Sequence, residues 1–283
     1  MILITTGAGK VGQHVVSQLA QKKVPARAGF HSQAKASALR EPGIEGAVLD
    51  FDSPESLKAA FRGIDTLFLV TPGSPDQGRQ DENLLAEAKR AGVKRVVKLS
   101  GKTSEGATAG FSLWNRDNER RIKETGLPYT ILRGNYFMQN LLTIADQIKG
   151  GAFTLGPAHL RPALIDTRDI AAMLVAALTE EGHAGKIYEV NGQEALNGHE
   201  QAAIISSVLE RPVKYIDVTV DEFVEQLKKI GMPDWMIGAF RVVATADPKD
   251  RGEQSSADVE RVLHRKPGTF EQFVKDYRAE FQP

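Results

Sequence analysis

The chain has 283 residues, enough for one large α/β domain or for one domain with a smaller companion. Lys plus Arg and Asp plus Glu both number 36, so no net charge points to nucleic acid or an anionic membrane as a partner. The absence of cysteine excludes disulfides, thiolate metal ligands and thiol catalysis. The longest apolar run, 170–178, is too short to cross a bilayer, and an apolar strand starts at residue 2, so we expect a cytoplasmic protein.

The first predicted element is an apolar strand that ends in glycines with the spacing G-x-G-x-x-G, followed by apolar residues at helical spacing. In this context Gly7 permits the tight turn, Gly9 lets the backbone approach a pyrophosphate, and Gly12 lets the helix pack closely on the strand. Unpaired N–H groups at the start of the helix favour phosphate. The segment Gly7, Ala8, Gly9, Lys10, Val11 and Gly12 is therefore predicted to bind a dinucleotide; the alternative is a structural turn without a ligand.

Short apolar segments then recur at intervals close to the ~30 residues of a βαβ unit. The predicted strands are Ile2–Thr5, Ala26–Phe30, Ala47–Leu49, Thr66–Val70, Arg95–Leu99 and Tyr129–Leu132. The predicted helices between them are Gly12–Gln21, Pro54–Phe61, Asp81–Ala91 and Arg116–Thr125. Apolar strands joined by helices predict a Rossmann-type, doubly wound parallel α/β sheet, with ligand outside the carboxyl ends of the strands.

After Arg133 the pattern changes. Glycines punctuate a loop-rich segment near residues 150–157, a helix is predicted at Asp166–Leu178 and a strand at Lys186–Val190. The carboxylates Asp166 and Asp169 are typical of a helix start. From about residue 197 the chain is predicted to be largely helical, at 201–209, 221–230, 233–243, 257–263 and 270–281. We expect a dinucleotide-binding domain at 1–150, to which the strand near 186–190 returns, and a smaller, mainly helical substrate lobe at 151–283.

The end of the second strand distinguishes NAD from NADP. An NAD-binding protein usually has an acidic residue there, which bonds the ribose hydroxyls and would repel a 2′-phosphate. Here the strand runs into His31, Ser32 and Lys35 without an acid, which favours NADP(H) over NAD(H). Arg27 contributes only if its side chain faces the ligand, and a solvated loop is the alternative for His31 and Lys35. Asp50 and Phe51, at the end of the third strand, are placed either to border the adenine or to cap and pack.

Several segments together resemble a known family. They are Gly7–Gly12, Arg95-Val96-Val97-Lys98-Leu99-Ser100, the run G-L-P-Y-T-I-L-R at 126–133 followed by Phe137, Met138 and Asn140, and Asp166-Thr167-Arg168-Asp169-Ile170-Ala171. The chain resembles the NmrA-like atypical short-chain dehydrogenases, in the branch with triphenylmethane reductase and NADPH-dependent quinone reductase. This resemblance implies a Rossmann fold, NADP at the glycine turn, and a substrate cleft between the sheet and the C-terminal lobe. His31 stands where many members have an arginine for the 2′-phosphate.

The usual proton relay of short-chain dehydrogenases, Tyr-x-x-x-Lys, is missing, because none of the five tyrosines has a lysine four residues later. Isoflavone-reductase relatives place a catalytic lysine on the corresponding helix, and the resemblance puts Asn115 there. Asparagine can bond a carbonyl but cannot act as acid or base. The candidates for a catalytic role are Asn115, Tyr136 and Lys102, and none of them is decisive.

An acceptor that takes hydride readily, such as a quinone or a cationic dye, needs mainly to be held flat against the nicotinamide. The candidate walls are Trp114, Tyr136, Phe137 and Met138, with a place in the core as the alternative for the last two. Thr71, Pro72 and Ser100 close the fourth and fifth strands and are expected to border the nicotinamide half. No histidine pair has metal-ligand spacing, so no metal site is predicted.

These observations favour an NAD(P)H-dependent reductase of a small aromatic acceptor that is quinone-like or dye-like. The second hypothesis is an NADP-binding redox sensor without turnover, which signals through a protein partner, and a sugar-nucleotide or isomerase role is the third. Partners are expected to include neither nucleic acid nor a membrane. The sequence leaves the oligomeric state open, a homodimer included.

Overall fold

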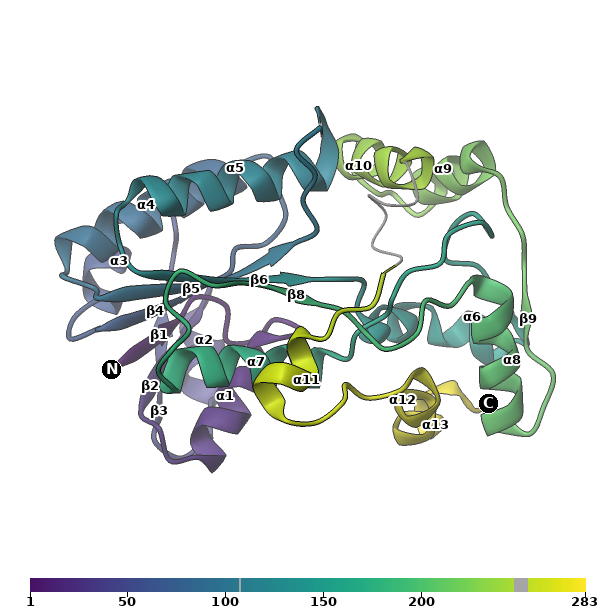
Figure 1. Cartoon of the computed structure of the whole chain (residues 1–283), viewed down its shortest axis with the longest axis horizontal. Coiled ribbons are helices and arrows are strands. Elements are labelled where there is room, and N and C mark those ends of the chain that lie inside the picture. The colour runs from purple at the N-terminus through teal and green to yellow at the C-terminus, as the bar shows by residue number, and fades with distance from the viewer. Residues whose placement is uncertain (107, 247–253) are drawn as a thin grey trace. The chain divides into compact units, whose positions relative to one another are not determined.

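The chain folds as the doubly wound α/β protein that its sequence predicts. The computed structural model describes residues 1–106, 108–246 and 254–283. Seven strands form one sheet in the order β3-β2-β1-β4-β5-β6-β8 (Figure 1). The pairs β1–β2, β2–β3, β1–β4 and β4–β5 are all parallel. The strands are β1 (Ile2–Ile4), β2 (Ala26–Phe30), β3 (Ile44–Val48), β4 (Thr66–Leu69), β5 (Arg95–Gly101), β6 (Tyr129–Gly134) and β8 (Ile187–Val190).

Helices cover both faces of this sheet (Figure 1). One face carries α3 (Pro54–Ala60), α4 (Gln77–Arg90) and α5 (Gly110–Glu124), and the other carries α1 (Gly12–Gln21), α2 (Gln33–Ala38) and α7 (Thr167–Thr179). Because both faces are covered, every residue of β1 and β4 is buried, which explains their continuous apolar runs. Since the strand order reverses between β1 and β4, a topological switch point lies at their carboxyl ends.

Two of these helices begin earlier than the apolar pattern predicts. Helix α4 starts at Gln77 instead of Asp81, and α5 starts at Gly110 instead of Arg116. The first turn of α4 is the polar run Gln77-Gly78-Arg79-Gln80, which presents no apolar stripe. Hydrophobic periodicity therefore misses the first turn of α4. The missed start of α5 contains Phe111, Leu113 and Trp114, so a polar first turn does not explain it.

The chain divides into two compact units, each made of several segments. The first unit comprises 1–101, 114–133 and 170–188, and the second comprises 102–113, 134–169 and 189–283. The expected single boundary near residue 150 does not describe this division. The chain departs from the sheet after β5, after β6 and again after β8, and each time it adds a segment to the second unit.

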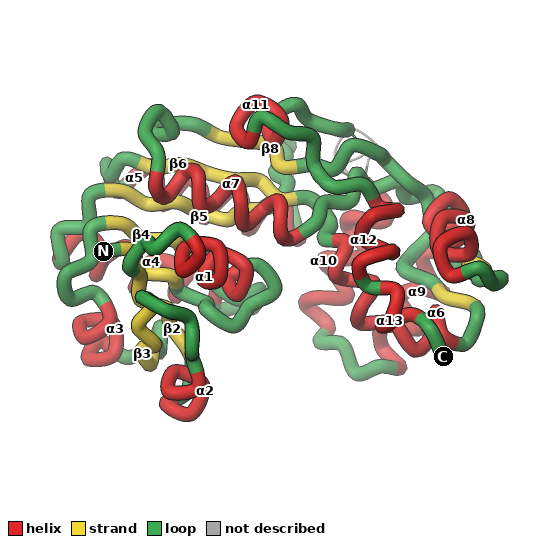
Figure 2. Tube along the Cα trace, turned by 90° about the horizontal axis from the view of Figure 1, so that it is seen from below, coloured by secondary structure: helices red, strands yellow, loops and turns green. Residues whose placement is uncertain are grey.

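The second unit is mainly helical (Figure 2). It holds a 3₁₀ helix at Met138–Ile144 and the helices α6 (Ala145–Lys149), α8 (Gly198–Leu209), α9 (Val220–Lys229), α10 (Asp234–Thr245), α11 (Asp258–Leu263), α12 (Phe270–Asp276) and α13 (Arg278–Phe281). A short parallel pair, β7 (Ala152–Phe153) and β9 (Lys214–Tyr215), was not predicted, because two-residue strands have no detectable alternation. The predicted helix at 270–281 is interrupted at Tyr277, whose ring packs on Phe273.

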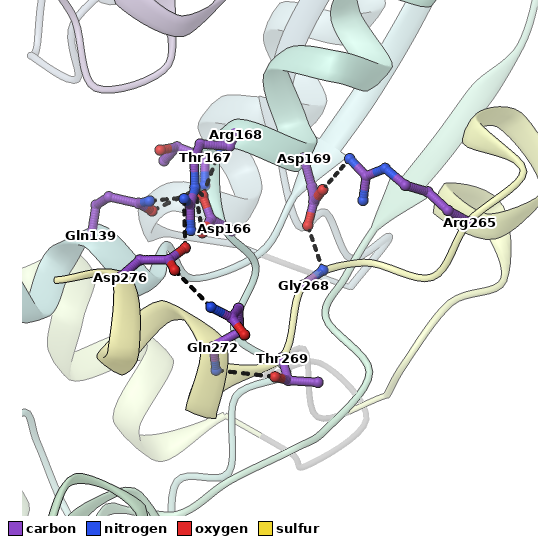
Figure 3. A network of polar contacts seen from close by, with 10 residues as sticks. All are labelled: Gln139, Asp166, Thr167, Arg168, Asp169, Arg265, Gly268, Thr269, Gln272 and Asp276. Carbon is purple, nitrogen blue, oxygen red and sulfur yellow. Dashed lines mark hydrogen bonds and ion pairs between the residues drawn. The ribbon is translucent and has the colours of Figure 1, made fainter. Parts of the chain in front are cut away.

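A polar network joins the start of α7 to the C-terminal segment of the second unit (Figure 3). Asp166 is buried and accepts hydrogen bonds from the Arg168 backbone and from Gln139. The Arg168 guanidinium bridges Asp166 and Asp276, at 2.6 and 2.7 Å. Asp169 accepts from the Gly268 backbone at 2.7 Å and pairs with Arg265. The two acidic residues at the predicted helix start therefore anchor residues 265–276.

Candidate functional site

The glycine turn after β1 is shaped by close contacts at two of its three glycines. A Cβ added at Gly12 would lie 1.8 Å from the Thr6 carbonyl oxygen, and one added at Gly7 would lie 2.9 Å from the Phe30 ring. The Gly7 amide also donates to the Gly29 carbonyl at 2.9 Å. The backbone of Thr6 therefore requires glycine at position 12, and the side chains of Phe30 and Ala28 crowd position 7.

Gly9 differs from the other two glycines of the motif. Its φ lies outside the left-handed region, and an added Cβ would come no closer than 3.5 Å to any protein atom. Neither backbone conformation nor packing explains glycine at this position. A surface left bare by a missing side chain is what a pyrophosphate needs for close approach, so these residues fit a dinucleotide.

The first turn of α1 is suited to an anion. No side chain caps the helix at Val11, and no acidic residue lies in its first turn. The N-terminal N–H groups of a helix that lacks a side-chain cap attract negative charge, which the helix dipole reinforces. Lys10 lies just before the N-cap Val11, and partial burial lowers the pKa of its ammonium group.

The residues after β2 expose positive charge and no acid. His31 and Lys35 are exposed, and Ser32 caps α2 by accepting a hydrogen bond from the Lys35 backbone. Arg27 does not join them, since its guanidinium donates to the carbonyls of Ala60 and Arg62, at 2.7 and 2.9 Å, and to Glu45. The condition under which Arg27 would face a ligand is not met, and its role is to tie α3 to the sheet.

Asp50 and Phe51 follow β3. The Asp50 carboxylate accepts from the Asp52 amide at 2.9 Å, which makes a local turn, and the side chain is exposed. Phe51 is half-buried and packs on the apolar core of the first unit. Both side chains therefore have a structural role here, and a contact with adenine stays a prediction.

The carboxyl ends of β4 and β5 carry buried hydroxyls. Thr71 donates to Asp81 at 2.8 Å, and Ser100 donates to Glu119 at 2.9 Å. Pro72, next to Thr71, is exposed. The residues that sequence reasoning missed here are Asp81 and Glu119, with Lys98 and Arg133 as their cationic partners. The detectable signal was Lys98, a charged residue inside the otherwise apolar run Val96–Leu99.

The remaining candidates fall in both units. Trp114 and Asn115 belong to the first unit, where the Asn115 amide would lie 2.6 Å from a Cβ added at Gly101. Lys102, Tyr136, Phe137 and Met138 belong to the second unit. Met138 is 2% exposed and lies in the core of that unit, in line with the alternative of a packing role. Burial raises the pKa of the Tyr136 phenol, so this group stays protonated at neutral pH.

Within the described ranges, no group of three or more His, Cys, Asp or Glu side chains could hold a metal ion. Over the same residues, no helix is long and apolar enough to cross a membrane.

Comparison with known proteins decides the family, because the NmrA-like family model matches residues 1–274. The chain belongs to the NmrA-like family. An NAD(P)H azoreductase of Xenophilus azovorans is 35% identical over 283 residues, which cover 99% of both chains. Quinone oxidoreductase 2 of Escherichia coli (strain K12) is 30% identical over 239 residues, which cover 83% of both chains.

Two solved structures share the fold of the chain. The NADPH-dependent quinone oxidoreductase of Escherichia coli, complexed with NADPH, has a TM-score of 0.87 at 26% identity, with 98% of this chain and 100% of that one covered. Triphenylmethane reductase of Citrobacter sp., complexed with NADP(H), has a TM-score of 0.85 at 25% identity, with 98% and 99% covered.

Proposed function

We propose that this chain is an NAD(P)H-dependent reductase that transfers hydride to a quinone-like or dye-like aromatic acceptor. The observation that carries the proposal is Gly9, a glycine that no close contact explains, inside a turn whose other two glycines have close neighbours. Support comes from the relatives, since an azoreductase matches over the full length and a quinone oxidoreductase over most of it.

We assign the cofactor to the first unit, with NADP(H) preferred over NAD(H). The backbone of Ala8, Lys10 and Val11 and the start of α1 would hold the pyrophosphate. The exposed side chains of His31 and Lys35, with Ser32, would hold the 2′-phosphate, and an acid that would repel it is missing there. Thr71, Pro72 and Ser100 would border the nicotinamide half, and Asp50 and Phe51 the adenine.

When bound, the cofactor supplies a hydride to the acceptor. The residues of the chain are then needed to hold the acceptor flat against the nicotinamide, and not to move a proton. Tyr136, whose pKa is raised by burial, can donate a hydrogen bond but not serve as a base at neutral pH. In the first unit, the Asn115 amide is a candidate for contact with an acceptor oxygen and Trp114 offers aromatic surface for a flat acceptor. In the second unit, the corresponding candidates are Lys102 for the oxygen and Tyr136 and Phe137 for the aromatic surface. The proton that a reduced quinone takes up can come from water.

The test is cofactor consumption, followed at 340 nm, with NADPH or NADH and a panel of quinones, triphenylmethane dyes and azo dyes. We expect turnover with at least one class and a higher kcat/KM for NADPH than for NADH. Tight binding of both NADP⁺ and NADPH without consumption in any reaction would favour the redox sensor. A higher kcat/KM with NADH would refute the NADP preference alone.

A further inference from the structure

The carboxyl ends of two neighbouring strands carry the same three-part arrangement. After β4, the Thr71 hydroxyl donates to Oδ1 of Asp81 at 2.8 Å, and the Lys98 ammonium donates to Oδ2 at 2.9 Å. The carboxylate therefore receives one hydroxyl and one cation. Both charged side chains are buried, with Asp81 at 0% and Lys98 at 1% exposure.

At the end of β5 the same plan recurs with different residues. The Ser100 hydroxyl donates to Oε1 of Glu119 at 2.9 Å. The Arg133 guanidinium binds both oxygens of that carboxylate, at 2.9 and 2.7 Å. Glu119 is also buried, and Thr71 and Ser100 are themselves only slightly exposed.

Thr71 and Ser100 follow equivalent positions of two neighbouring strands. Strands β4 and β5 are parallel, and the last pair in register is Leu69 with Lys98. Thr71 and Ser100 each follow two residues later, on strands that are about 4.8 Å apart. Both therefore lie at the edge where a doubly wound sheet binds ligand, on the β4–β5 side of the switch point.

A buried ion pair gives little stability compared with apolar residues of similar size, so the two buried carboxylates of Asp81 and Glu119 at one edge call for another explanation. A hydroxyl has one proton and two lone pairs, and an ionised carboxylate can only accept. Because Thr71 and Ser100 each give their proton to a carboxylate, they present only lone pairs to a ligand. The pair can accept hydrogen bonds from a ligand and cannot donate them.

We propose that Asp81 and Glu119 are positioning residues that hold Thr71 and Ser100 as hydrogen-bond acceptors for the carboxamide N–H₂ of a bound nicotinamide. This inference rests on the proposed function, which puts the nicotinamide half at these two strand ends. The ribose hydroxyls both donate and accept, whereas the carboxamide nitrogen is the one pure donor of that half. The site would thus bind a pyridine ring that carries a carboxamide more tightly than one whose substituent lacks the N–H₂ group.

The test is the dissociation constant of three oxidised nucleotides, measured by titration calorimetry without any turnover. They are NADP⁺, its 3-acetylpyridine analogue, which lacks the N–H₂ group, and its thionicotinamide analogue, which keeps it. We expect the unmodified protein to bind the thionicotinamide analogue within about 2-fold of NADP⁺ and the acetylpyridine analogue about 10-fold more weakly, because the two acceptors then lose their donor.

Variants separate positioning from general stability. The double variant Thr71→Val/Ser100→Ala should bind all three nucleotides within about 2-fold of one another. Glu119→Ala removes the acceptor of the Ser100 proton, so the hydroxyl can donate as well as accept and the preference for the amide should shrink. Asp52→Ala, which removes an exposed carboxylate after β3, is the matched control and should keep the full preference. If Glu119→Ala does not fold, the double variant decides.

Two results overturn the inference while leaving the proposed function intact. One is equal binding of the acetylpyridine analogue and NADP⁺ by the unmodified protein. The other is a full preference for the amide in the double variant. Failure of all three nucleotides to bind would overturn the proposed function, and the inference with it.

Discussion

Gly12 rests directly on Thr6: a Cβ added at Gly12 would lie 1.8 Å from the Thr6 carbonyl oxygen and 2.9 Å from its carbonyl carbon. The obstacle is backbone, which a rotamer change cannot relieve. Gly12→Ala must therefore push α1 away from the turn. We expect a loss of about 3 kcal/mol in the free energy of unfolding, at the upper end of overpacking costs, measured by urea denaturation.

Gly9→Ala should leave the stability almost unchanged and weaken the binding of NADPH. Its Cβ would lie 3.5 Å from the nearest protein atom, so stability should change by less than about 0.5 kcal/mol, as for surface substitutions. Binding of NADPH should nevertheless weaken at least about 10-fold, because the methyl group occupies the approach of the pyrophosphate. Gly238→Ala is the control, since no atom lies within 4 Å of an added Cβ there. Unchanged NADPH affinity in Gly9→Ala would place the pyrophosphate elsewhere.

The choice between NADP and NAD can be tested at Lys35. Removing an exposed cation that contacts the 2′-phosphate should weaken NADPH about 2- to 10-fold and leave NADH almost unchanged. The measurement is the ratio of the two dissociation constants for Lys35→Ala and for His31→Ala. Lys58→Ala, which removes an exposed lysine from α3, should not alter the ratio. An equal loss for both nucleotides would show that Lys35 does not read the 2′-phosphate.

The sequence predicts those features of the fold and of the site that depend on hydrophobic periodicity and on the spacing of glycines. The strands of the sheet, the turn at Gly7–Gly12 and the absence of an acid after β2 all follow from local pattern. The buried carboxylates could not be predicted in the same way. Asp81 and Glu119 lie on polar helices, and only the tertiary structure shows which of their many charged residues turn inward.

The division into units was also hidden from the sequence. It depends on contacts among the three segments that follow β5, β6 and β8, and contacts between distant segments leave no local pattern. The same holds for Arg27, whose neighbours in the chain suggested a ligand and whose actual partners are the carbonyls of Ala60 and Arg62.

The pair Lys98–Asp81 makes a prediction about stability. Lys98→Met leaves the Asp81 carboxylate buried without its cation, which should cost about 3–5 kcal/mol in the free energy of unfolding. The double variant Asp81→Asn/Lys98→Met removes both charges and should be more stable than Lys98→Met alone. Urea denaturation of the two single variants and the double variant gives the coupling energy. Additive losses would mean that the two side chains do not act as a pair.

Asp276 should make part of the stability pH-dependent. The hydrogen bond from Gln272, at 2.7 Å, and the contact with Arg168 hold the pKa of this carboxyl below its usual range. A carboxyl whose pKa is lower in the folded state stabilises the fold at pH values above its unfolded pKa, near 3.8. That contribution disappears as the pH falls through the folded pKa.

Asp276→Asn should therefore lower the free energy of unfolding at pH 6–7, by less than about 1 kcal/mol because the carboxylate is partly solvated. The difference from the unmodified protein should stay constant down to about pH 5 and shrink below about pH 4. Asp146→Asn is the matched control, because that carboxylate is 97% exposed and its lysine partner lies 3.4 Å away. Urea denaturation across this pH range measures both variants. A difference for Asp276→Asn that persists unchanged at pH 2 would show that shape, and not charge, accounts for it.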